Sequence, residues 1–236
     1  MTQTGKVILL ALAVVGVLVV GLTSRVEAGL FGFGGDSWKE EVLLHDGSKM
    51  IVKRSQTYGG QHEVGQSSPI KEHIITFTVP RSSTRVTWTS EYGEDLGRTN
   101  FHLLAVHVLN GTPYIVAEPN LCLSYNKWGR PNPPYVFFKY EGKTWQRIAL
   151  EEVPAEFTTI NVAVDILGRE VKNLMSLGLV SSEKIEELNR HIQRSEAKTI
   201  LRDPVKMGSL GSSVNCIEMV FDKGMWRGGS GHSINK

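Results

Sequence analysis

The chain is poor in cysteine: it has only Cys122 and Cys216 among 236 residues, and no CxxC pair. A zinc ribbon or a thioredoxin-type redox site needs closely spaced cysteines, so the sequence excludes both classes. We expect the two cysteines to form one disulfide, because such bonds are typical of exported proteins. Two separate buried thiols are the alternative that the sequence leaves open.

An excess of either charge is also missing. The chain has 26 Lys and Arg against 24 Asp and Glu, a net charge of +2. Without residues 1–28, which hold Lys6, Arg25 and Glu27, 24 basic and 23 acidic residues remain, a charge of +1. Nucleic-acid-binding domains usually carry a clear basic excess, so we predict no nucleic-acid partner.

Motifs that would reveal catalysis or metal binding are missing as well. The seven histidines form no HExxH, and no GxSxG nucleophile elbow is present. Ser181 to Lys184 matches the SxxK pattern of penicillin-recognising serine enzymes, but SDN and KTG are lacking, and helix capping explains these residues better. His102 and His107 lie five apart on one predicted strand, so we expect them to point to opposite faces. We predict no catalytic residue, no metal site and no cofactor.

What the sequence does contain begins with an uncharged apolar run, Val7–Leu22, preceded by Lys6. Val26-Glu27-Ala28 ahead of Gly29 fits a signal-peptidase site, which indicates a cleaved signal peptide. The run is longer than a usual signal core of roughly 7 to 15 residues and shorter than the roughly 20 of a spanning helix, so an uncleaved anchor stays open. Either reading predicts export, with the rest of the chain periplasmic or anchored in the inner membrane facing the periplasm.

Most of the chain after the leader reads as short antiparallel strands. Asp46-Gly47 and Asn110-Gly111 each stand between two apolar segments and predict tight hairpins. The nearly continuous apolar run Phe101–Leu109 predicts a central strand covered on both faces. The remaining expected strands are 40–45, 49–54, 72–79, 84–90, 113–117, 135–140 and 144–150, with 92–100 as a loop. The spacing predicts an antiparallel β-sandwich or a strongly curved sheet.

The composition changes after Pro154. Helical spacing of apolar residues predicts a helix over 160–177 that ends at Gly178, and a second helix from Ser181 or Ser182 to about Leu201. Residues 214–221 alternate and predict a final strand that returns to the sheet, followed by a frayed tail from Gly224.

These patterns give an α+β, mainly β fold with a C-terminal helical hairpin and a final strand. The expected organisation is residues 1–28 signal peptide or membrane anchor, 29–37 Gly-rich linker, 38–156 antiparallel β-domain, 157–202 helical hairpin, and 203–236 terminal strand and flexible tail.

The loop from Asn126 to Tyr135 gathers residue types that dominate protein interfaces, namely Trp128, Arg130 and Tyr135, on a segment stiffened by three prolines. A rigid connection with Trp128 folded back onto the sheet is the alternative. A second polar loop, Lys53–Gln66, adds Arg54, Tyr58 and His62 as weaker candidates for binding.

Three stretches, 38–42, 110–116 and 125–134, resemble a family of uncharacterised exported bacterial proteins. The resemblance spans about residues 38–157 and implies a bacterial envelope location; it carries no activity, cofactor or site residue. The predicted function is a non-enzymatic module that binds an envelope protein or another envelope component, with the membrane as a further partner if the leader is uncleaved. The alternative is a periplasmic hydrolase whose site is assembled from distant loops.

Overall fold

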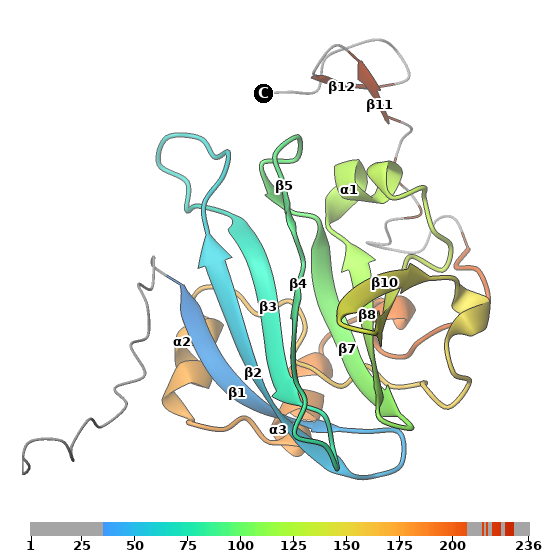
Figure 1. Ribbon diagram of the computed structural model, residues 1–236. Coiled ribbons are helices and arrows are strands. Elements are labelled where there is room, and N and C mark those ends of the chain that lie inside the picture. Colours follow the sequence, from blue (N-terminus) through green and yellow to red (C-terminus); the bar gives the residue numbers. More distant parts are fainter. Residues whose placement is uncertain (1–34, 207–213, 215, 217–218, 223–224, 229–236) are drawn as a thin grey trace, which may run out of the picture. The chain divides into compact units, whose positions relative to one another are not determined.

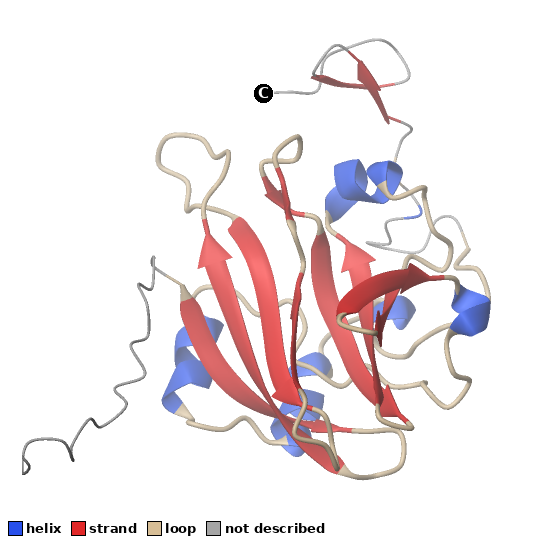
Figure 2. Cartoon of the chain, viewed as in Figure 1, coloured by secondary structure: helices blue, strands red, loops and turns tan. Residues whose placement is uncertain are grey.

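The computed structural model describes residues 35–206, 214, 216, 219–222 and 225–228. The predicted fold class is confirmed, because 39% of the described residues are in strands and 17% are in helices, and the sheets are antiparallel. Figure 2 shows helix only as short segments around the strands. The predicted leader and most of the predicted linker lie outside the described residues.

The first sheet is a four-stranded meander in the order β1-β2-β3-β4 (Figure 1). Its hairpin turn after β1 forms at Asp46-Gly47 as predicted, with Gly47 at φ 79°, a conformation that glycine adopts without steric cost. Along each strand, buried and exposed residues alternate, so one face of the sheet packs against the core. The strands are β1 (Asp36–Leu43), β2 (Lys49–Tyr58), β3 (Ile70–Thr78) and β4 (Arg85–Thr89).

The second sheet has the order β10-β9-β8-β7. Asn110 and Gly111 both have positive φ in the turn between β7 and β8, as the predicted two-residue hairpin requires. The strand β7 is buried on both faces as predicted, but it is the last strand of its sheet and not a central one. The strands are β7 (Phe101–Leu109), β8 (Thr112–Pro119), β9 (Val136–Glu141) and β10 (Thr144–Ile148).

The segment between the two sheets differs from the predicted loop. It contains a small hairpin, β5 (Tyr92–Gly93) with β6 (Arg98–Thr99). Ser90 links this region to β3, because its backbone N–H donates to the His73 carbonyl.

Strand β7 is buried twice because each of its faces belongs to a different apolar cluster. Phe101 and Val106 pack with residues of the first sheet, including Ile75 and Phe77. Leu104 and Ala105 instead pack with residues of the C-terminal part of the chain, including Phe157. The second sheet is therefore covered on one side by the first sheet and on the other by the segment that follows β10.

The side chain of one asparagine bonds both backbone groups of Val106 at the free edge of β7. Asn161 accepts a hydrogen bond from the Val106 N–H at 3.0 Å and donates to the Val106 carbonyl at 2.7 Å and the Leu43 carbonyl at 3.0 Å. A buried edge strand would otherwise leave backbone groups without partners, which is costly.

The helical prediction for 160–177 is wrong over its first half. Residues 160–168 form an irregular segment, and the helix α2 covers only Arg169–Ser176. Asp165 at φ 56° and Gly168 at φ 53° leave the helical region, and Asn161 bonds the sheet instead of a helical turn. The apolar residues Val162, Val164 and Ile166 are buried against the sheets and α2, which a regular helix would not achieve with the same hydrogen bonds.

The second helix begins as predicted and ends earlier. Gly178 follows α2 at φ 71°, and Ser181 caps α3 by accepting the Lys184 N–H at 3.3 Å. The helix α3 covers Ser182–Asn189 and does not continue to Leu201. Between Asn189 and Leu201 the chain forms only the short 3₁₀ turn η2 (Ser195–Ala197). The other short helices are α1 (Leu121–Lys127) and the 3₁₀ turn η1 (Leu150–Glu152).

The prediction that a final strand over 214–221 returns to the sheet is wrong about the partner of that strand. Strand β11 (Met219–Asp222) pairs with β12 (Met225–Gly228), with Asp222 opposite Met225, and these two form their own sheet. The expected strand therefore pairs with the segment that follows it, part of which we predicted to be frayed tail. Among the described residues, no helix has the length and apolar character needed to cross a membrane.

Candidate functional site

Trp128 is positioned by the end of α1 and lies partly buried on the core between the sheets. Its ring centroid is 4.6 Å from that of Phe101, and its Nε1 donates to Asn100 Oδ1 at 3.3 Å. Arg147 lies over the ring, 5.5 Å from its centroid, and donates to the Trp128 carbonyl at 3.2 Å. The ring therefore folds back onto the sheet along one side and keeps part of its surface in solvent.

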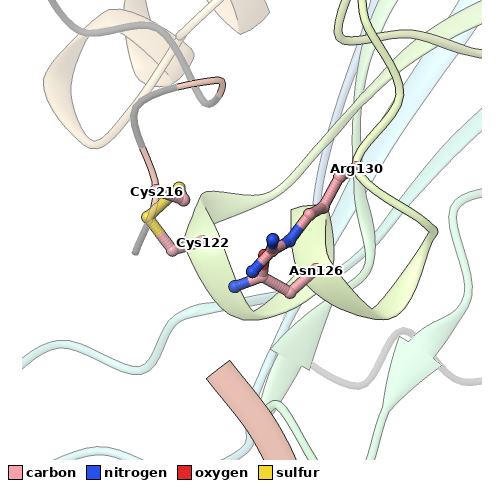
Figure 3. The surroundings of a disulfide bond; sticks show 4 residues. All are labelled: Cys122, Asn126, Arg130 and Cys216. Carbon is pink, nitrogen blue, oxygen red and sulfur yellow. A yellow bond between two sulfur atoms is a disulfide. The ribbon is translucent and has the colours of Figure 1, made fainter. Parts of the chain in front are cut away.

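Arg130, the second predicted binding residue of that loop, has an exposed side chain. Its Nε donates to Asn126 Oδ1 at 2.6 Å, and Figure 3 shows this pair beside the disulfide. The Arg130 side chain is exposed, and within the fold it is bonded to the last turn of α1.

Tyr135 does not lie on the surface that we predicted. It is 3% exposed, and its hydroxyl donates to the carbonyls of Glu196 and Thr199 and accepts the Leu201 N–H. Burial raises the pKa of Tyr135, so the phenol stays neutral. Its role is to hold the segment after η2 against the second sheet.

Arg54 is likewise buried, at 3% exposure, so its predicted contact with a partner is wrong. It forms an ion pair with Glu40, Nη1 to Oε1 at 3.1 Å, and donates to the Ala163 carbonyl at 2.6 Å. Tyr58 lies nearby in the first sheet, where its hydroxyl donates to Asp36 at 2.6 Å. The sequence pattern missed these roles because neither partner of Arg54 is near it in the sequence.

The structure brings Trp128 together with residues that the sequence reasoning missed. Tyr140 and Trp145 are opposite each other across the hairpin of β9 and β10, with ring centroids 5.2 Å apart. Like Trp128, both are partly buried and pack against the core between the sheets. Trp145 Nε1 donates to the Thr87 carbonyl of β4 at 2.7 Å, which fixes the hairpin over the edge of the first sheet. We call Trp128, Tyr140, Trp145 and Arg147 the aromatic face.

A groove with a volume of about 490 Å³ lies between α3 and the segments 159–161 and 197–198. Its apolar lining comes from Leu43, Ile160, Ile185 and Ala197, and no histidine contributes to it. Ser182 also lines the groove, but its hydroxyl donates to Glu41 at 3.2 Å. The groove therefore offers no histidine that could activate this serine as a nucleophile.

The Ser181–Lys184 stretch acts as a helix start and not as an SxxK site. Hydrogen bonds from its own backbone N–H and from the Ser181 hydroxyl lower the pKa of Glu183 to about 2. Such donors are what the first turn of a helix offers a carboxylate. The capping interpretation is confirmed.

The two histidines of β7 lie on the same face, so the prediction of opposite faces is wrong. The register shift between Leu103 and Ala105 inserts one residue, which reverses the alternation that sequence spacing assumes. His102 bonds Asn120 through Nε2 at 2.8 Å, and His107 stacks on a phenylalanine of the C-terminal segment.

A polar cluster surrounds His102. Glu118 pairs with it across β7 and β8 and forms an ion pair with Arg194, which also reaches Asp165 at 3.5 Å. Burial lowers the pKa of His102 and of its neighbour His73, and burial raises the pKa of Glu118. Neutral histidines bonded in this way support the packing of the sheets. No group of three or more metal-binding side chains occurs in the part of the chain that the structure describes.

Cys122 and Cys216 form the predicted disulfide, with their Cα atoms 5.3 Å apart and a sequence separation of 94 (Figure 3). Tyr125, Val205 and Val214 form a small apolar cluster in the same region. The bond therefore holds the C-terminal part of the chain to α1.

Comparisons with known proteins add no relative: no family model, curated protein or solved structure matches this chain. The functional argument therefore rests on the side chains described above.

Proposed function

We propose that this chain is an exported bacterial envelope protein that binds another envelope protein through the aromatic face, without catalysing a reaction. The observation that carries the binding proposal is the gathering of Trp128, Tyr140, Trp145 and Arg147 on one partly exposed surface. The resemblance to exported bacterial proteins and the predicted leader support the envelope location.

Side-chain chemistry supports a protein partner. Tryptophan, tyrosine and arginine are enriched among the residues that carry most of the binding energy of protein interfaces. Here the rings are held in place before binding, by the Trp145 bond to Thr87 and by the packing of Trp128 on Phe101. Pre-ordered side chains lose less conformational entropy when a partner docks, so more of the contact energy becomes affinity.

The disulfide supports export. Disulfides form and persist in oxidising compartments such as the periplasm. The apolar run Val7–Leu22, whether it is cleaved or retained, supplies a route to that compartment. An envelope location also places the aromatic face where envelope proteins are the available partners.

The groove beside α3 gives no support to the hydrolase alternative, because it contains no histidine. In the cluster around His102, this histidine bonds Asn120, and Glu118 is paired with Arg194 within the fold. Binding therefore remains the better supported of the two functions.

The proposal is tested by photocrosslinking in the bacterium that makes the protein. The photoreactive aromatic amino acid benzoylphenylalanine replaces Tyr140, with the same replacement at Val64 as a control, since Val64 is fully exposed in the loop between β2 and β3. We expect one envelope protein to be crosslinked at Tyr140 and not at Val64. No crosslink at Tyr140, or the same products at both positions, contradicts the proposal.

Affinity for that partner, once purified, gives the second test. Arg147→Ala should leave stability within about 1 kcal/mol, because an exposed cation–π contact contributes about 0.5 to 1 kcal/mol. It should weaken binding by about 2 kcal/mol, or roughly 30-fold, if Arg147 belongs to the energetic centre of the interface. Arg85→Ala, which removes an exposed arginine from β4, is the matched control and should leave affinity unchanged. Equal affinities of Arg147→Ala and wild type would remove the aromatic face from consideration.

A further inference from the structure

Half of the large exposed apolar side chains in the described part of the chain lie in or beside α2. Of the eight large exposed hydrophobic residues among those described, four lie between Leu167 and Leu179. Met175, Leu177 and Leu179 fall within five positions and are 43%, 52% and 41% exposed. We call residues 175–179 the apolar turn.

The fold fixes these side chains outward. The helix α2 buries Val171 and Leu174 against Trp38 of β1, so its inward positions are already filled. Directly after the turn, Val180 donates its N–H to the Lys39 carbonyl at 2.9 Å and accepts the Glu41 N–H at 2.8 Å. Because the chain is held on both sides, the leucines of the turn cannot rotate into the core.

Three cationic side chains lie on the elements next to the apolar turn. Arg169 and Lys172 are exposed on α2, and Lys39, whose carbonyl accepts the Val180 N–H, is exposed on β1. Figure 1 shows α2 beside β1. Glu170 is the exposed acid of α2, so the net charge of these residues is positive. Exposed apolar residues flanked by lysine and arginine are the composition of surfaces that bind anionic lipid bilayers.

The position of the turn in the chain points to the same partner. The predicted leader run ends at Leu22 and β1 begins at Asp36, which leaves 13 residues between them. Even fully extended, 13 residues span at most about 45 Å. Val180, directly after the apolar turn, is bonded to β1, the strand that follows these 13 residues.

We propose that the apolar turn docks on the surface of the lipid bilayer in which the N-terminal run is inserted, with Lys39, Arg169 and Lys172 contacting anionic headgroups. The inference rests on the export part of the proposed function, with the N-terminal run retained as an anchor, and not on the aromatic face. A single apolar anchor with a basic, apolar second contact fixes the orientation of a domain on a membrane better than the anchor alone.

The test follows the environment of one position in the full chain, reconstituted in vesicles of phosphatidylcholine and phosphatidylglycerol. Leu177→Cys is labelled with the fluorophore NBD; both native cysteines are in the disulfide, so the label enters only the new site. Val64→Cys, labelled in the same way, is the control in a fully exposed loop. We expect NBD at 177 to shift to the blue and to lose its quenching by aqueous iodide in vesicles, while NBD at 64 does neither.

Further variants identify what covers the turn. Met175→Ser with Leu179→Ser, in the Leu177→Cys background, should restore iodide quenching at 177, because two apolar contacts with lipid are gone. Quenching at 177 that is the same in vesicles and in detergent overturns the proposal. Protection that depends on protein concentration and persists in detergent assigns the turn to a second copy of the chain and also overturns it.

The outcomes separate this inference from the proposed function. Failure of the full chain to associate with vesicles removes the anchor on which the inference rests. Loss of the Tyr140 crosslink affects only the aromatic face and leaves the NBD result unchanged.

Discussion

Removing the guanidinium of Arg54 should destabilise the fold rather than weaken binding. Glu40, which is 0% exposed, accepts hydrogen bonds from Arg54 at 3.1 Å, from Trp38 Nε1 at 2.6 Å and from the Ala163 N–H at 3.3 Å. Arg54 also donates to the Ala163 carbonyl and lies over the Trp38 ring, 5.2 Å from its centroid. The pair therefore joins β1 and β2 to the irregular segment before α2.

The expected loss in the free energy of unfolding follows from the groups that Arg54→Ala leaves buried without a partner. Deleting one member of a buried ion pair costs about 3 to 5 kcal/mol, because the remaining charge stays buried without its counterion. The Ala163 carbonyl also loses a donor, which alone costs about 1 to 3 kcal/mol and is contained in that range. For a domain of this size, 1 kcal/mol corresponds to about 2 to 4 °C in Tm, so Tm should fall by about 6 to 20 °C.

Urea denaturation followed by fluorescence measures this change in the free energy of unfolding. Lys53→Ala is the matched control, because Lys53 is the adjacent β2 residue, is exposed, and should change stability by no more than about 0.5 kcal/mol. Arg54→Lys should lose part of the stability, since one ammonium does not reproduce the planar contact with both Glu40 and Ala163. A loss below about 1 kcal/mol for Arg54→Ala would show that the buried pair does not stabilise the fold as argued.

The disulfide and a buried histidine give two further predictions. Replacing Cys122 and Cys216 by serine should lower the free energy of unfolding by up to about 4 to 5 kcal/mol, the loop-entropy value for this separation; quantitative alkylation of both thiols in unreduced protein would contradict the bond. Burial lowers the pKa of His107 to about 4, against the bond to the Thr159 carbonyl that raises it. In the unfolded chain, His107 takes up a proton near pH 6.5. The contribution of the neutral His107 to the free energy of unfolding is therefore fully present above pH 6.5 and is lost as the pH falls toward 4, by up to about 3 kcal/mol. His107→Gln should reduce this pH dependence in denaturation at pH 7 and pH 5, and an unchanged slope would refute the assignment.

Local patterns predicted the hairpins because their causes are local. Asp46-Gly47 and Asn110-Gly111 have the backbone freedom that tight turns require, and alternation of apolar residues then sets the face that each strand buries. The start of α3 at Ser181 was predictable for the same reason, since a capping hydroxyl acts within three residues.

The first half of the predicted helix over 160–177 shows where local reasoning fails. Apolar residues at helical spacing were present, but the Asn161 side chain bonds the open edge of β7, and the chain around it is not helical. That edge is created by strands some 50 residues earlier, so no window of sequence around Asn161 contains the information. The bulge before Ala105, which turns His102 and His107 to one face, is likewise a matter of pairing between strands.

By itself, the sequence determined the class of fold, the turns, the absence of recognisable catalytic motifs and the residues able to form the disulfide, because each depends on composition or on neighbours along the chain. Only the tertiary structure decided which side chains reach solvent. Arg54 and Tyr135 carry the chemistry of binding residues, yet they are buried by partners far away in sequence, at Ala163 and Glu196. Trp128 belongs to the aromatic face because the β9–β10 hairpin places Arg147 over its ring. Long-range packing of this kind sets which side chains are exposed.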